Sequence, residues 1–204
     1  MNAAPLRNVI FDFGGVLVRW QPEVIIAGFY PDEALRERVR DAVFRHPDWI
    51  ALDRGTLSES AAIERFAGRM QRPAAEMRAL MQHIKDSLTP MPEPIALLEE
   101  LVQRGVAVYG LSNMAASVFA HLKSRHEHWD RFRGIVISAE VGLVKPEPAI
   151  FHHIAERYAL VPAETVFIDD HLLNIESARR LGFRTIHFAN AAQCRRELDT
   201  HIAR

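Results

Sequence analysis

Residues 9–17 read Val9-Ile10-Phe11-Asp12-Phe13-Gly14-Gly15-Val16-Leu17, an apolar run broken by one carboxylate and two glycines. The run predicts a buried strand that ends at Asp12 and is followed by a tight turn. Because glycine has no Cβ, the backbone there can approach a ligand closely. Asp12 is therefore a candidate nucleophile or metal ligand, although a strand followed by Asp and two glycines is also an ordinary turn.

Four further short apolar runs, and the helical spacing between them, indicate the fold class. Predicted strands cover residues 9–11, 106–111, 135–137, 166–168 and 185–188. Predicted helices cover residues 95–104, 114–123, 146–158 and 172–181. Strands that alternate with helices favour right-handed crossovers, so we expect an α/β fold with a doubly wound parallel sheet.

A long segment after the first predicted strand interrupts this alternation. It contains no convincing strand and shows only helical patterns, at residues 33–44, 59–70 and 74–84. At ~70 residues it is far longer than an ordinary connection. The returning segment 89–94 contains three prolines, which predicts a stiff, hinge-like linker. The expected domains are a catalytic core, residues 1–17 and 89–204, and a helical cap above Asp12, residues 18–88.

The composition excludes several classes of partner. The 204 residues carry a formal net charge of −1, which gives no electrostatic reason to expect nucleic acid or an anionic membrane. No secretory pattern is visible and no apolar run approaches the ~20 residues of a membrane span, so we expect a cytoplasmic monomer or homodimer. The single cysteine, Cys194, excludes an internal disulfide and is expected to be an inert surface thiol.

Polar side chains follow several predicted strands at the point where each strand ends. They are Asp12, Ser112, Asn113, Asp169 and Asp170, and Lys145 lies in the loop that follows the third predicted strand. Ligands bind at this edge of open α/β sheets. Clustered carboxylates repel one another unless a cation lies among them, and Mg²⁺ takes one or two carboxylates together with phosphate and water. Lys145 and the Ser112 hydroxyl then suit phosphate oxygens, and an aspartate beside metal-bound phosphate can attack phosphorus.

Each of these residues also has a local explanation. Ser112 and Asn113 can cap the following helix. Asp169 and Asp170 can cap the next helix, which would leave Asn174 on the surface, and Lys145 can be a plain loop residue before a helix whose first turn contains proline. Their occurrence at successive strand ends favours one shared site.

Together these segments resemble the haloacid dehalogenase superfamily of hydrolases. The matching pieces are Phe11-Asp12-Phe13-Gly14-Gly15-Val16-Leu17, Leu111-Ser112-Asn113, Lys145-Pro146-Glu147, Phe167-Ile168-Asp169-Asp170 and residues 174–182. The resemblance implies a Rossmann-like core and a small four-helix cap, and residues 49–58 resemble the middle of that cap. The most similar subgroup is the bacterial α-D-glucose-1-phosphate phosphatases, with the N-terminal phosphatase domain of soluble epoxide hydrolases more distant.

The resemblance also implies a role for each site residue. Asp12 would be the nucleophile and a Mg²⁺ ligand, the backbone carbonyl of Gly14 a second ligand, and Asp170 the third. Asp169 would support the site. Ser112, Asn113 and Lys145 would hold the phosphate, with Lys145 also stabilising the transition state. The expected activity is Mg²⁺-dependent hydrolysis of a small phosphorylated metabolite, with sugar phosphates as one candidate class.

One departure from the superfamily pattern concerns Gly14. Most phosphatases of the superfamily have a second aspartate there, which protonates the leaving oxygen and later activates water. General acid–base help is typically worth about 10²–10⁴-fold, so its absence matters most for poor leaving groups. The glucose-1-phosphate phosphatases also have glycine at this position. His171 is a conceivable substitute acid, but it is expected to be solvent-facing at the start of a helix.

Two other functions are compatible with the missing acid. A metal-independent 2-haloacid dehalogenase also lacks it, but the Asp169-Asp170 pair is typical of a metal site. A non-catalytic binding protein would keep the fold without the reaction. In the cap, Arg54, His46 and Trp49 are possible substrate contacts, although such residues usually belong to a bundle core or to its solvated face.

Overall fold

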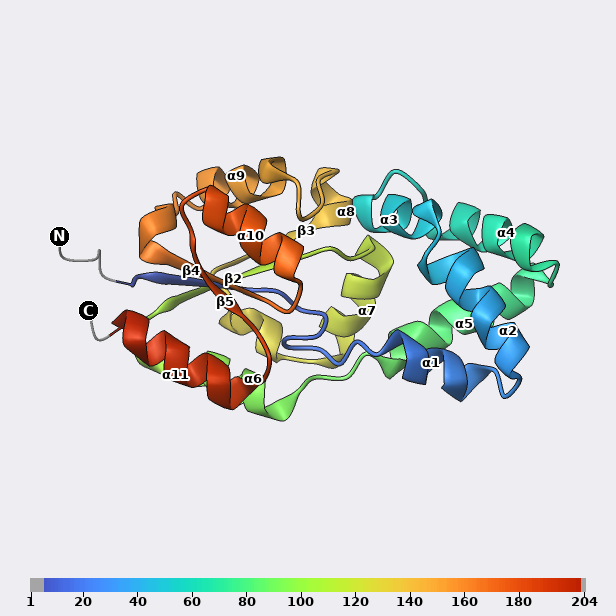
Figure 1. Ribbon diagram of the computed structural model, residues 1–204, viewed down its shortest axis with the longest axis horizontal. Coiled ribbons are helices and arrows are strands. Elements are labelled where there is room, and N and C mark those ends of the chain that lie inside the picture. The colour runs from blue at the N-terminus through green and yellow to red at the C-terminus, as the bar shows by residue number, and fades with distance from the viewer. Residues whose placement is uncertain (1–5, 203–204) are drawn as a thin grey trace.

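A computed structural model describes residues 6–202, which form a sheet-containing lobe and a helical lobe (Figure 1). The five strands are parallel and lie in the order β3-β2-β1-β4-β5. They are β1 (Asn8–Phe11), β2 (Ala107–Ser112), β3 (Gly134–Ile137), β4 (Thr165–Asp169) and β5 (Arg184–His187). This is the predicted α/β class, and β1 lies at the centre of the sheet with its carboxyl end toward the helical lobe.

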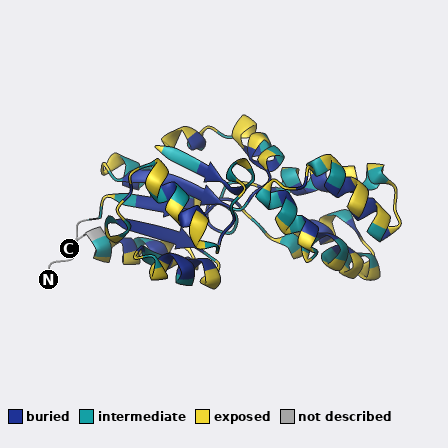
Figure 2. Cartoon of the chain, turned by 90° about the horizontal axis from the view of Figure 1, so that it is seen from above, coloured by how far each residue is buried: buried dark blue, intermediate teal, exposed yellow. Residues whose placement is uncertain are grey.

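The strands are buried because both faces of the sheet are covered by helices, which explains why they appear in the sequence as continuous apolar runs. Side chains of a strand alternate between the two faces. Val9 and Phe11 of β1 accordingly belong to one apolar cluster and Ile10 to the other. Figure 2 shows the buried strands between two partly exposed helical layers.

The core helices follow the predicted alternation, with two additions, one at residues 138–141 and one at residues 191–202. They are α6 (Pro92–Gln103), α7 (Ala116–Arg125), the short α8 (Ser138–Val141), α9 (Pro148–Arg157), α10 (Leu172–Arg180) and α11 (Ala191–Ile202), with 3₁₀ turns at His128–Arg131 and Pro162–Glu164. Helix α11 was not predicted. Its buried face includes Cys194 and Leu198, four residues apart, so Cys194 is fully buried and the expected surface thiol is wrong. Burial raises the pKa of this thiol to about 12.

The insert is helical throughout, as the sequence predicts. Its helices are α1 (Pro22–Phe29), α2 (Glu33–Val39) with a following π turn (Arg40–Phe44), α3 (Pro47–Arg54), α4 (Glu59–Met70) and α5 (Ala74–Ser87). The short α3 lies nearest the core and packs against α8. Within residues 6–202, no helix combines the length and apolar character needed to cross a membrane.

The two chain crossings between the lobes are hydrogen-bonded to each other. The Arg19 N–H donates to the Thr89 carbonyl and the Met91 N–H to the Leu17 carbonyl, each at 2.8 Å. The linker is shorter than expected, because Pro92 already begins α6, where the first turn tolerates a missing N–H. The predicted domain boundaries, 17/18 and 88/89, fall beside this crossing and remain a prediction.

Candidate active site

Three carboxylates meet at the carboxyl end of the sheet. Asp12 follows β1 and Asp169 ends β4, and these strands are neighbours. One oxygen from each of Asp12, Asp169 and Asp170 lies within 4.8 Å of the others. The Asp12 carboxylate is oriented by the Phe13 N–H, which donates to Oδ1 at 2.6 Å. The predicted convergence of strand ends therefore exists.

Lys145 lies within this cluster and is 3% exposed. Its Nζ is 2.8 Å from Asp12 Oδ1 and 2.7 Å from Asp169 Oδ2. The loop that carries it is held by Asn113, whose Nδ2 donates to the Lys145 carbonyl and whose Oδ1 accepts from the Lys145 N–H, both at 2.8 Å. The side chain of Asn113 thus positions Lys145. The expected contacts of Asn113, Lys145 and Ser112 with phosphate remain predictions. Ser112 is buried at the end of β2.

Asn174 holds Asp169 in place. Its Nδ2 lies 3.0 Å from both carboxylate oxygens of Asp169, and the His171 N–H donates to Oδ1 at 2.8 Å. Asn174 is 8% exposed, so the alternative that places it on the surface is wrong. His171 is exposed at the start of α10, as the solvent-facing interpretation predicts.

The charges of the cluster do not balance. Burial, reinforced by Asp169 and opposed by Lys145, raises the pKa of Asp12 to about 8. Burial disfavours the charged form of Lys145, but Asp12 and Asp169 outweigh it and raise its pKa. One lysine therefore contacts two of the three carboxylates, and the buried Asp170 Oδ1 has no hydrogen-bond partner among residues 6–202. Such a set of oxygens fits a divalent cation.

Gly15 makes room for Asp170. Its φ is +76°, and a Cβ built there would collide with the Asp170 carboxylate. Asp12 and Asp170 are consequently the side chains that would hold Mg²⁺, with the Gly14 carbonyl as the further ligand that the resemblance implies.

Gly15→Ala is expected to weaken Mg²⁺ binding by about 10–100-fold, the range seen when the groups that orient metal ligands are changed. The matched control is Gly105→Ala, because Gly105 also has a positive φ, +80°, but has open space where the Cβ would be. Both variants should lose about 1–2 kcal/mol of stability from the backbone alone. Thermal unfolding and Mg²⁺ titration of turnover check this, and equal Mg²⁺ affinities in the two variants would contradict it.

A cavity of about 590 Å³ lies between the carboxylate cluster and the cap. Its floor includes Asp12, Lys145 and Ser112. Its cap side includes His46 and Trp49, two of the three cap residues considered from sequence. The cavity places any bound ester between the polar sheet edge and the cap.

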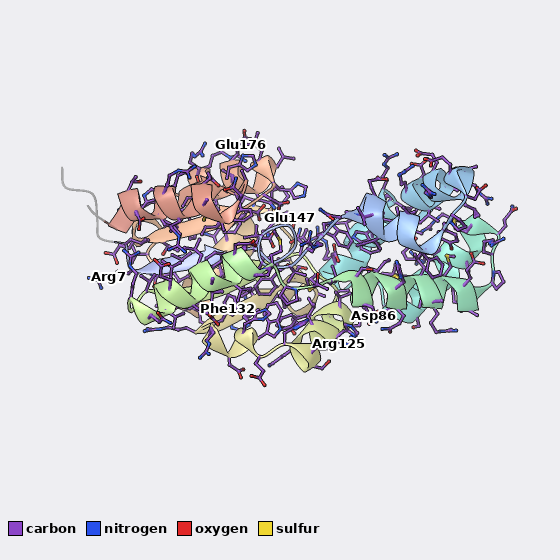
Figure 3. All side chains as sticks on the ribbon, turned by 90° about the horizontal axis from the view of Figure 1, so that it is seen from below. Arg7, Asp86, Arg125, Phe132, Glu147 and Glu176 are labelled. Atoms are coloured by element: carbon purple, nitrogen blue, oxygen red, sulfur yellow. The ribbon has the colours of Figure 1, made fainter. Side chains whose placement is uncertain are left out.

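The third cap residue, Arg54, has a different role. Its Nη1 is 2.9 Å from Glu147 Oε2 in a two-pronged ion pair between cap and core. A second contact joins Asp86 of α5 to Arg125 of α7 at 3.4 Å (Figure 3, where Asp86, Arg125 and Glu147 are labelled at the junction). These pairs join the cap to the core at two places.

Sequence reasoning missed Asp53, which lines the cavity from the end of α3. The core holds this residue through its backbone carbonyl, which accepts a hydrogen bond from Ser138 Oγ, and the nearby Ala115 N–H acts to lower the pKa of its side chain. Burial raises the pKa of Asp53 to about 7. No local pattern marks the residue, because its position depends on how the cap packs on the core.

Comparisons with known proteins agree with this geometry. Residues 6–182 match the haloacid dehalogenase-like hydrolases. A sesquiterpene phosphatase of Aspergillus oryzae is 30% identical over 91% of this chain and 91% of its own length. A D-ribitol-5-phosphate phosphatase of Bacteroides thetaiotaomicron is 25% identical over 95% of this chain and 97% of its own.

A solved structure shares the fold. It is a haloacid dehalogenase family enzyme from Bacteroides thetaiotaomicron in complex with magnesium and inorganic phosphate, with a TM-score of 0.74 at 24% identity, over 89% of this chain and 93% of that one. The family match covers most of the chain, and the sheet edge carries the motifs on which the resemblance rested. The chain belongs to the haloacid dehalogenase-like hydrolase family.

Proposed function

We propose that the protein is a Mg²⁺-dependent phosphomonoester hydrolase that acts on a small phosphorylated metabolite through an aspartyl-phosphate on Asp12. The observation that carries this proposal is the carboxylate cluster, in which Lys145 contacts Asp12 and Asp169 while a buried oxygen of Asp170 lacks a partner. Two full-length relatives named as phosphatases support the same reaction class.

The chain's own residues supply most of the chemistry. Phe13 and Lys145 both contact Oδ1 of Asp12, so we assign the attack on phosphorus to Oδ2. The P–O bond to the alcohol breaks as the Asp12–phosphorus bond forms, and water then hydrolyses the aspartyl-phosphate to restore Asp12. Lys145 and Ser112 would donate to the phosphate oxygens. Mg²⁺, held by Asp12, Asp170 and the Gly14 carbonyl, would supply the remaining positive charge.

The names of the relatives do not agree on the alcohol to which the phosphate of the substrate is esterified. They specify a sesquiterpene phosphate in one case and a polyol phosphate in the other. The sugar phosphate considered from sequence remains a prediction.

The test is turnover of 4-nitrophenyl phosphate with Mg²⁺ and with a chelator, followed by trapping of radiolabelled phosphate on Asp12. Turnover that needs Mg²⁺, with label on Asp12, is expected. Halide release from 2-chloropropionate without metal would instead identify a dehalogenase. Absence of both reactions would identify a binding protein and end the proposal.

A further inference from the structure

The cavity above Asp12 has an aromatic wall that phosphate chemistry does not require. Trp20 and Trp49 stack with ring centroids 6.0 Å apart, and Phe44 stacks on Trp49 at 4.8 Å. All three side chains line the cavity and are only partly buried. Partly exposed aromatic faces that gather around a cavity are typical of a site for an apolar ligand.

Apolar side chains continue the wall on both lobes. Ile84 of α5 and Leu88 come from the cap, and Met114 and Val118 come from the core. The lining as a whole is predominantly apolar. A molecule bound here would therefore touch hydrocarbon on the cap side and on the core side.

Polar groups line the cavity at its floor and, from the cap, at Arg45, His46 and Asp53. Several are already engaged: Arg45 pairs with Glu37 and Asp41, and His46 Nδ1 accepts from the Asp48 N–H. Asn113 bonds the Lys145 backbone and Asn174 bonds Asp169. A sugar would bring several hydroxyl groups against this apolar wall, and a buried hydroxyl without a partner is costly. A hydrocarbon would instead gain by leaving water.

We propose that the alcohol half of the substrate is a hydrocarbon chain or ring system, so that the enzyme hydrolyses phosphate monoesters of apolar alcohols. This inference rests on the proposed function. The cavity volume, about 590 Å³, lies within the roughly 300–1,000 Å³ of small-molecule sites, so it has room for a sizeable organic group beyond the phosphate.

The test compares acetyl phosphate, glucose 1-phosphate, and butyl, octyl and dodecyl phosphates, the last two below the concentrations at which they aggregate. We expect kcat/KM to rise by up to about fourfold per added methylene until the cavity is full. Octyl phosphate should exceed glucose 1-phosphate. Two results would overturn this inference and leave the proposed function intact. Either acetyl phosphate is hydrolysed but the chain-length series is flat, or acetyl phosphate is hydrolysed and glucose 1-phosphate is the best ester. Failure to hydrolyse acetyl phosphate or any ester would overturn the proposed function with it.

Variants of Trp49 test whether the aromatic wall causes the dependence on chain length. Trp49→Ala should flatten the chain-length series, whereas Trp49→Phe should keep most of the slope. Val161→Ala is the control, because Val161 is 50% exposed and does not line the cavity. An unchanged slope in Trp49→Ala would contradict the proposal.

A second inference concerns the proton that an alkoxide leaving group needs. The missing acid at Gly14 leaves this task open, and Asp53 is a carboxyl residue that lines the cavity and whose backbone carbonyl is held by Ser138 Oγ of the core. Ala115 lies three residues beyond Ser112, at the same edge of the sheet as Asp12. Within residues 6–202, no ion pair to Asp53 is present.

We infer that Asp53 is the general acid. Its carboxyl proton passes to the ester oxygen as the P–O bond breaks, and the resulting carboxylate accepts a proton from the water that hydrolyses the aspartyl-phosphate. A pKa near 7 suits both steps. The other charged or titratable side chains that line the cavity are Asp12, Arg45, His46, Lys145 and His171. On α3 itself, Asp48 pairs with Arg65 and Arg69, and Arg54 pairs with Glu147.

Asp53→Asn should lower the rate at which octyl phosphate forms the aspartyl-phosphate by about 10²–10⁴-fold, and should change that rate little for 4-nitrophenyl phosphate, because that leaving group needs no proton. Wild-type kcat for octyl phosphate should fall as pH rises through about 7, where the acid form is lost, and this limb should vanish in the variant. Asp41→Asn, on an exposed cap carboxylate, is the control. Equal losses on both esters, or an unchanged pH profile, would overturn the assignment.

Discussion

Asp12→Asn is expected to reduce phosphate-ester turnover by about 10⁴-fold or more, the scale seen when a nucleophile is removed. The amide cannot replace the attacking carboxylate oxygen. It keeps the side-chain shape, and its oxygen can still accept from the Phe13 N–H. Lys145 keeps its second partner, Asp169, at 2.7 Å. Steady-state assays with 4-nitrophenyl phosphate should show the loss of turnover. Thermal unfolding should show that the variant remains folded.

Asp170→Asn is the informative comparison for Asp12→Asn. It removes a charge from the same cluster but not the proposed nucleophile. Because Asp170 Oδ1 is the unpartnered oxygen that fits a cation, this variant should need more Mg²⁺ and recover part of its turnover when Mg²⁺ is raised. Recovery of turnover by Mg²⁺ in Asp12→Asn but not in Asp170→Asn would reverse the two assignments.

The sheet and its polar edge could be predicted because their signals are local. A strand buried on both faces is an apolar run, and a side chain at its end is the next residue along the chain. Asp12, Asp169 and Asp170 were predicted as site residues in this way, and Lys145 was predicted from the loop that follows the third strand. Helix α11 was missed because its buried face is sparse, with Cys194 and Leu198 among many charged residues. Helix α1 was missed because it is short and has no side-chain cap.

The substrate end of the site could not be predicted from such signals. Trp20, Phe44 and Trp49 come together only when the cap folds, and Asp53 reaches the cavity only because α3 packs on α8. Asn113 shows the same limitation within the core. Its side chain bonds the backbone of Lys145, 32 residues away, and no spacing in the sequence shows that contact.

The other large effect is expected at Lys145. Lys145→Met removes the cation that lies between Asp12 and Asp169, so kcat should fall by about 10²–10³-fold, the usual cost of losing one donor to developing charge. The buried carboxylates of Asp12 and Asp169 would also lose their ionic partner, which costs about 3–5 kcal/mol of the free energy of unfolding. Assays at saturating Mg²⁺ and denaturant unfolding measure the two effects separately.

Lys85→Met is the matched control, because Lys85 is also largely buried and pairs with a carboxylate, Glu59, at 2.7 Å, but lies outside the cavity lining. It should lose stability without a comparable loss of kcat. In Lys145→Met the folded-state pKa of Asp12, which burial already raises, should lie further above its unfolded value. Groups with a raised folded pKa favour the folded state at low pH, so the stability deficit of Lys145→Met should shrink as pH falls toward about 5. If the two lysine variants lose kcat equally, Lys145 acts on stability alone and the phosphate is stabilised by other groups.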